Sequence, residues 1–169
     1  MSKTVKIILL FVVVAILAGA LYFLNADINT NKNQVVLEIA ETDVEKITFK
    51  TFYSREAVIT KENNQWKCEE VFLKDAFKND IFNSISAIRV ISEIENPDSL
   101  AAYGLDPANV VVNIETVKGD CEILIGDYND IQKTYYIKIL DKVYLVEPES
   151  KLNYAFNYDT DAFIQGQKK

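Results

Sequence analysis

The stretch "NPDSLAAYGLDPANVVVNIE" spans residues 96–115 and contains the point where the chain changes from helix-like to strand-like periodicity. Its first two residues, an asparagine and a proline, suit a helix cap and a first helical turn. Gly104 can adopt the left-handed conformation that ends a helix, and Pro107 prevents the helix from resuming. From Val110 onward, apolar residues alternate as in a half-buried strand. The stretch therefore predicts a short connector helix that leads into a strand.

On both sides of this connector the sequence predicts antiparallel hairpins. Short runs rich in β-branched and aromatic residues alternate with polar turns, which is the pattern of strands joined by tight connections. The expected strands are 44–52, 57–61, 65–70, 90–95, the two runs that begin at Val110 and Cys121, and a final hairpin of 134–140 and 143–147. A short helix is expected over 149–156.

Between these strands, one segment has a different period. Phe77, Ile81, Ile85 and Ile88 recur at spacings of three or four residues within 73–88. This spacing places them on one face of a helix, with polar residues on the opposite face. The sequence therefore predicts an α+β domain of antiparallel β-hairpins with one main amphipathic helix and a short connector helix.

The N-terminal segment 7–24, "IILLFVVVAILAGALYFL", contains 18 residues without a charge. As a helix it would be roughly 27 Å long, close to the hydrocarbon thickness of a bilayer. Lys3 and Lys6 precede it and favour a cytoplasmic N-terminus. We therefore expect a transmembrane helix that leaves the remaining chain extracytoplasmic on the cell membrane.

A cleaved signal peptide is the alternative for this segment, because Ala18-Gly19-Ala20 resembles a small-x-small cleavage site. The apolar run continues through Leu24, however, where a mature secreted N-terminus is usually polar. Either reading places the domain outside the cytoplasm. The expected organisation is an anchor at 1–26, a tether and domain entry at 27–43, the domain at 44–158 and a C-terminal tail at 159–169.

The composition argues against several classes of function. The chain has a formal net charge of −7, which disfavours binding to nucleic acid. It contains no histidine and no glycine-rich loop, so histidine-based nucleophilic catalysis and phosphate cradles are not indicated. We predict no catalytic, cofactor-binding or metal-binding residue and expect a protein that is not an enzyme. A carboxylate-dependent hydrolase remains as an enzymatic alternative.

Two features of the side chains leave alternatives open. Cys68 and Cys121 lie on different expected strands and point inward, so they form either a disulfide or two separate thiols. Near the C-terminus, Tyr154, Phe156 and Tyr158 alternate and form a candidate partner-facing patch. The alternative is that these rings cover the sheet. Such exposed rings suit either a protein partner or a cell-wall glycan.

The chain resembles the bacterial domain of unknown function DUF4340 over residues 44–147. The resemblance is carried by "KITFK", "ITKENNQWKC", "YGLDP", "ILIGD", "TYYIKIL" and "VYLVEPE". The matching residues are Trp66, Tyr103, Gly104, Leu105, Pro107, Gly126, Asp127, Tyr136 and Tyr144.

This resemblance implies a membrane-anchored extracytoplasmic protein, of a kind often encoded beside ABC transporter components. It implies no activity, cofactor or catalytic residue. We therefore expect a non-enzymatic binding or accessory component of an envelope or ABC-transporter-associated complex. A module that binds cell-wall glycan or a small ligand is the alternative.

Overall fold

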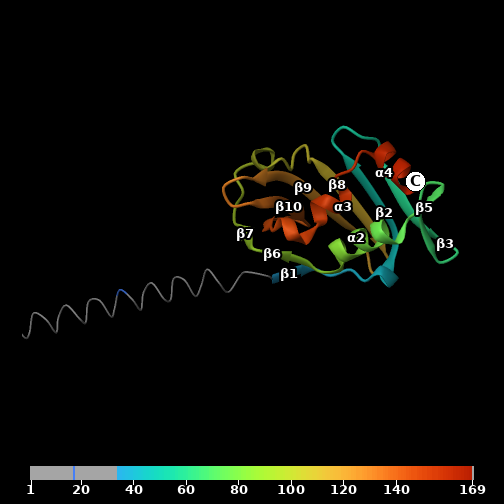
Figure 1. Ribbon diagram of the computed structural model, residues 1–169. Helices are drawn as coiled ribbons and strands as arrows, with labels where there is room; N and C mark the ends of the chain where they lie inside the picture. Colours follow the sequence, from blue (N-terminus) through green and yellow to red (C-terminus); the bar gives the residue numbers. More distant parts are fainter. Residues whose placement is uncertain (1–16, 18–33, 169) are drawn as a thin grey trace, which may run out of the picture. The chain divides into compact units, whose positions relative to one another are not determined.

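The computed structural model describes Leu17 and residues 34–168 (Figure 1). The chain divides into two units, Met1–Lys32 and Asn33–Lys169, and the description below concerns the second. Among the described residues, no helix is long and apolar enough to cross a membrane. The expected anchor at 7–24 lies outside the described residues, apart from Leu17.

The second unit is mixed α+β and is built on a nine-stranded antiparallel sheet. The strand order is β5-β4-β3-β2-β8-β9-β10-β11-β7, so most neighbours in the sheet are also neighbours along the chain. The strands are β2 (Val44–Thr51), β3 (Ala57–Glu62), β4 (Gln65–Cys68), β5 (Val71–Phe72), β7 (Ser92–Ile94), β8 (Val110–Thr116), β9 (Cys121–Asn129), β10 (Thr134–Ile139) and β11 (Lys142–Val146). The expected antiparallel hairpins are therefore confirmed.

A second, two-stranded sheet lies where the domain begins. It pairs β1 (Gln34–Leu37) with β6 (Ile88–Val90). A 3-10 helix, η1 (Glu41–Asp43), follows β1, and the Glu41 carboxylate accepts a hydrogen bond of 2.9 Å from Trp66 Nε1. The region expected to be a tether and domain entry thus contributes ordered elements from residue 34 onward. The expected strand at 90–95 is two strands, because β6 pairs with β1 and β7 pairs with β11.

Three α-helices cover one face of the large sheet (Figure 1). They are α2 (Asp75–Ser86), α3 (Leu152–Phe156) and α4 (Thr160–Lys168). Register places Ile47 opposite Ile114 and Phe49 opposite Val112, so their side chains share this face. The Phe49 ring packs edge-on against Phe156, with 5.6 Å between ring centroids. This layer of aliphatic and aromatic side chains is the core.

The main helix predicted from the spacing of apolar residues is confirmed. Helix α2 lies within the expected range 73–88 and buries Ile81 and Ile85.

The prediction that residues 159–169 form a C-terminal tail is wrong for most of this segment. Residues 160–168 form α4, and Phe163 is only 2% exposed. The Phe163 ring contacts Phe49 at 5.5 Å and Phe77 at 5.7 Å between centroids. Burial of this ring, together with Ile164, packs the short helix against the sheet.

The connector in the opening stretch is present but begins later than expected. The 3-10 helix η2 covers Leu100–Tyr103, with Ser99 as its N-cap, whereas Asn96 has a positive φ of 50°. Gly104 ends it in the left-handed conformation, with φ of 64°. The role expected for Gly104 is confirmed, while the asparagine and proline that precede the helix belong to a loop.

Candidate functional site

The connector packs on the face of the sheet opposite the helices. Tyr136 and Ile137 are adjacent on β10, so their side chains point to opposite faces. Ile137 lies in the core, and the Tyr136 ring lies against Tyr103, with 4.8 Å between centroids. The Tyr136 hydroxyl accepts a hydrogen bond of 2.7 Å from Asn129 Nδ2. The connector thus covers a ring that would otherwise face solvent.

Two glycines allow this close approach. A Cβ on Gly126 would lie 2.1 Å from the carbonyl oxygen of Tyr103 and 3.0 Å from the side chain of Leu105. A Cβ on Gly104 would lie 2.4 Å from Asp127 Oδ1. The backbones of the connector and of β9 therefore touch where neither position leaves room for a side chain.

The residues that carry the family resemblance thus fall into separate groups. Tyr103, Gly104, Leu105, Gly126, Asp127 and Tyr136 meet at the connector. Trp66 and Tyr144 are buried in the core, and Pro107 is exposed after a cis peptide bond with Asp106. Each of these positions has a packing role or lies at the surface of a turn, and together they do not enclose a ligand cavity.

The expected partner-facing patch near the C-terminus is divided by the structure. Tyr154 is 60% exposed, whereas Phe156 is fully buried against Phe49. Tyr158 is half-buried between Tyr154 and Phe163, and burial raises its pKa to about 12. The prediction that Phe156 faces a partner is wrong, because α3 turns that side chain into the core. Tyr154 alone is well exposed.

A different group of aromatic rings lines an open cleft at one end of the sheet. This aromatic cleft has a volume of about 320 Å³. Its lining residues are Thr51, Phe52, Tyr53, Asn109, Gly126, Tyr128, Tyr135, Asn153 and Asn157. They come from the end of β2, the start of β8, the end of β9, the start of β10, and α3 with its C-cap. Antiparallel pairing brings these four strand ends together.

The rings of the aromatic cleft form two pairs. Phe52 and Tyr53 pack at 4.8 Å between centroids, and Tyr128 and Tyr135 pack at 4.9 Å. Tyr53 is 94% exposed, and both Phe52 and Tyr128 are also exposed. Asn109 is already engaged through its Nδ2, which donates to Asp127 Oδ1 at 2.7 Å. The cleft therefore combines apolar ring surface with neutral amides.

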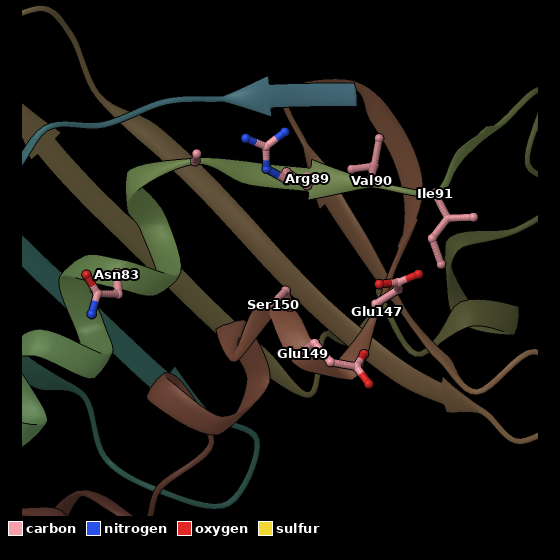
Figure 2. Close-up of a pocket in the computed structure, with 8 residues that line it drawn as sticks. Asn83, Arg89, Val90, Ile91, Glu147, Glu149 and Ser150 are labelled. Carbon is pink, nitrogen blue, oxygen red and sulfur yellow. The ribbon is translucent and has the colours of Figure 1, made fainter. Parts of the chain in front are cut away.

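Two further hollows follow the aromatic cleft: the central hollow shares Tyr128 with the cleft, and the Arg89 pocket shares Ile91, Glu147 and Glu149 with the central hollow. The central hollow, of about 420 Å³, is lined by Ile91, Tyr128, Gln132, Lys133, Thr134, Glu147, Pro148 and Glu149. The Arg89 pocket, of about 280 Å³, is lined by Asn83, Ala87, Arg89, Val90, Ile91, Glu147, Glu149 and Ser150. Figure 2 shows the labelled side chains of this pocket arriving from α2, β6 and the segment around η3 (Pro148–Ser150).

One residue that lines the central hollow carries a buried polar atom without a partner. Thr134 is 3% exposed, and its hydroxyl oxygen finds no hydrogen-bond partner within the described residues. A buried hydroxyl without a partner is rare because its desolvation is not compensated. Close by, Lys133 Nζ lies 5.9 Å from the Tyr128 ring centroid and 3.7 Å from Asp130 Oδ1.

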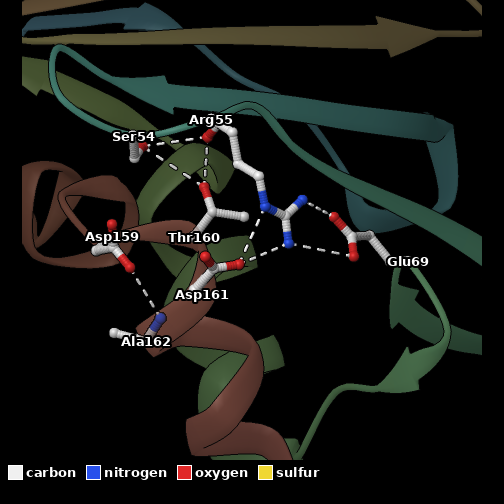
Figure 3. Close-up of polar contacts among 7 residues, drawn as sticks. All are labelled: Ser54, Arg55, Glu69, Asp159, Thr160, Asp161 and Ala162. Atoms are coloured by element: carbon white, nitrogen blue, oxygen red, sulfur yellow. Dashed lines mark hydrogen bonds and ion pairs between the residues drawn. The ribbon is translucent and has the colours of Figure 1, made fainter.

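The most connected polar cluster of the domain has a structural role. Arg55 pairs with Glu69 and, at 2.8 Å, with Asp161 Oδ1, and these contacts raise the pKa of its guanidinium (Figure 3). Thr160 Oγ1 donates to the carbonyl oxygen of Arg55. The cluster links the start of α4 to the β2–β3 and β4–β5 connections. All of its charges are thus paired within the fold.

The cysteines are buried or half-buried thiols, and the acidic residues are dispersed over the described part of the chain. Cys68 and Cys121 are free thiols, and burial raises the pKa of Cys68 to about 11. A raised pKa keeps a thiol protonated and unreactive. Over the described residues, no three acidic, thiol or imidazole groups converge as a metal site. The question of the disulfide, left open by the sequence, is answered in favour of two separate thiols.

Sequence reasoning missed the aromatic cleft. Tyr135 and Tyr136 are adjacent on β10, and the structure packs Tyr128 against the first ring and Tyr103 against the second. The available signal was the pair Phe52 and Tyr53, two adjacent rings at a strand end, where burial of both is geometrically difficult.

Comparison with known proteins finds no matching family model, no matching curated protein and no matching solved structure.

Proposed function

We propose that this chain is a non-enzymatic, membrane-anchored binding protein whose extracytoplasmic domain engages another component of the cell envelope. The apolar segment 7–24 and the lysines before it support the anchor and the orientation. The resemblance to DUF4340 supports an accessory role in an envelope or ABC-transporter-associated complex, and we propose membership of that family on the same residues.

The aromatic cleft is the observation that carries this proposal. Exposed aromatic rings gather at the cleft, although large rings at a surface normally find a partner. The cleft offers Phe52, Tyr53 and Tyr128 from strand ends and the tight connections that follow them, on a scaffold that is already folded before binding. A binding role therefore fits this surface better than a catalytic one, which requires a nucleophile or a paired acid and base.

Anchoring adds to such a binding role. A domain tethered to the membrane encounters a partner in the same plane at a raised effective concentration. A modest intrinsic affinity at the cleft is then sufficient for stable association. The domain would act by holding or positioning the partner.

The test places a photo-crosslinking amino acid at position 53 of the full chain in intact cells. We expect a specific adduct with an envelope component after irradiation. The matched controls carry the same amino acid at Val117 and Leu140, which are exposed apolar positions at the opposite end of the sheet. Adducts of equal yield at all three positions would show that the cleft has no selective partner.

A further inference from the structure

The three hollows are linked by shared lining residues, and together we call them the groove. The aromatic cleft and the central hollow share Tyr128, and the central hollow and the Arg89 pocket share Ile91, Glu147 and Glu149. The groove therefore runs from the Phe52 and Tyr53 loop, past the ends of β9, β10 and β11, to β6. A row of neighbouring hollows fits an extended, chain-like ligand better than a compact one.

We propose that this groove binds a glycan chain of uncharged pyranose units. The inference rests on the proposed binding function and names the chemical class of the ligand. Four kinds of group in the groove support it: exposed aromatic rings, neutral amides, an unpartnered hydroxyl and a charged end.

The ring-bearing end suits the apolar face of a sugar. The C–H bonds on one face of a pyranose carry a small positive charge, and the face of an aromatic ring carries a negative one. Phe52, Tyr53, Tyr128 and Tyr135 supply ring surface over the length of the aromatic cleft. Stacking of sugar on ring also removes apolar area from water on both sides.

The amides suit the hydroxyl groups at the sugar's edge. Asn109, Asn153 and Asn157 line the aromatic cleft, and Gln132 lines the central hollow. Each primary amide has two N–H donors and one acceptor oxygen, so it can pair with a hydroxyl in either direction; in Asn109 one of the donors is already bound to Asp127. No charged side chain lines the aromatic cleft, so an ionic ligand gains nothing there.

Thr134 supplies a second, independent observation. Its hydroxyl, which has no partner within residues 34–168, belongs to a residue that lines the central hollow midway along the groove. A small local adjustment that lets a ligand hydroxyl reach this oxygen would satisfy a group that the fold itself leaves unpaired. An apolar ligand segment could not form this hydrogen bond, so the desolvation of the Thr134 hydroxyl would stay uncompensated.

At the far end, Glu147, Glu149 and Arg89 line the same pocket. A neutral hydroxyl group donates a strong hydrogen bond to a carboxylate and accepts one from a guanidinium. The carboxylates and the net charge of −7 disfavour a polyanionic glycan. An extended polypeptide would typically add to a free strand edge, whereas this groove crosses strand ends and presents side chains.

The experiment uses the full chain in detergent micelles on an array of immobilised oligosaccharides. The array carries neutral hexoses and N-acetylhexosamines, with sulfated and uronic-acid glycans for comparison. We expect retention on neutral glycans, with titration of the best soluble hexasaccharide then giving an affinity. Tyr128→Ala should weaken that affinity about tenfold, and Thr134→Val about fivefold.

Tyr154→Ala is the matched control, because this exposed tyrosine lies outside the groove and should bind as the unchanged chain does. No retention on any neutral glycan, or equal loss in Tyr128→Ala and Tyr154→Ala, would overturn the inference. If position 53 crosslinks only to a polypeptide in cells and the chain is not retained on neutral glycans, the glycan inference is wrong, and the proposed binding function is still supported. Absence of both the crosslinked adduct and the retention on glycans would contradict both the glycan inference and the proposed binding function.

Discussion

At the scale of single residues, Gly126 occupies a position where one added methyl group meets backbone. The nearest atom to an added Cβ is the Tyr103 carbonyl oxygen, which a side-chain rotation cannot move away. We predict that Gly126→Ala lowers the free energy of unfolding by about 1–3 kcal/mol, measured by urea denaturation.

The matched control for this substitution is Gly166→Ala in α4. A Cβ at position 166 would meet only Phe77 Cζ at 3.9 Å, an ordinary contact. Alanine also loses less backbone entropy than glycine in a helix, so this variant should gain about 0.5–1 kcal/mol. A loss of stability at position 166 equal to that at position 126 would show that the connector contact is not the cause.

At the buried residue Thr134 we predict a substitution that stabilises the fold, in contrast to the loss expected at Gly126. Valine has nearly the same shape and removes a buried oxygen that no described residue satisfies. Thr134→Val should therefore raise the free energy of unfolding by about 1 kcal/mol. Thr160→Val is the comparison, because the Thr160 hydroxyl donates to the Arg55 carbonyl and its removal should lower stability. Chemical denaturation of both variants tests the pair.

Cys68 gives a pH dependence. Burial raises its pKa from 9.0 to about 11, so between these values the thiol ionises in the unfolded chain but not in the folded one. The unfolded state then binds fewer protons, and stability falls as the pH rises from 9 to 11. At pH 10 the loss from this group should be about 1 kcal/mol. Cys68→Ala should show a shallower decline than the unchanged chain in denaturation between pH 8 and pH 10.

At the scale of elements, α4 allows packing and ion pairing to be compared. Phe163 is buried among three other rings, whereas the Arg55 pairs are half exposed to solvent. Phe163→Ala should cost about 3–5 kcal/mol of stability. Arg55→Gln should cost much less, because its ion pairs are exposed to solvent and screened by it. Hydrogen exchange of the α4 amides, with α2 as reference, measures both. A larger effect at Arg55 would mean that the ion pairs, and not the ring, hold the helix.

The sequence predicts the elements whose apolar residues repeat with a regular spacing. The stripe of Phe77, Ile81 and Ile85 repeats over three turns, and the alternation in β8 repeats over a whole strand, so both are visible locally. In α4 only Phe163 and Ile164 are buried apolar residues, and a single ring gives no period. Its burial depends on Phe49, more than 100 residues away, which no local pattern can indicate.

At the scale of the whole molecule, the groove could not be predicted for a related reason. Its rings, amides and hydroxyl come from strand ends that are separated along the chain and meet only through the register of β8, β9 and β10. Phe52 and Tyr128 show no shared spacing. The sequence therefore predicts a fold class and a compartment from local patterns, whereas a binding surface made by several strand ends requires the topology.

The proposed anchor gives a prediction for the whole chain. A chain with residues 7–24 should stay with the membrane fraction after alkaline carbonate extraction, and a chain that begins at Gln34 should be released. A full chain found in the soluble fraction with residues 1–20 removed would instead establish the cleaved signal. The proposal of an anchored protein would then be wrong, and the extracytoplasmic domain would be secreted.

The pairing of β1 with β6 has a mechanical consequence. The β1 register joins only three residue pairs, from Gln34 opposite Val90 to Leu37 opposite Ile88. Tension applied at the N-terminal end of the domain reaches these few contacts before it reaches the nine-stranded sheet. The β1–β6 ribbon would therefore separate first and lengthen the link to the domain, while the aromatic cleft, which contains no residue of β6, would keep its shape.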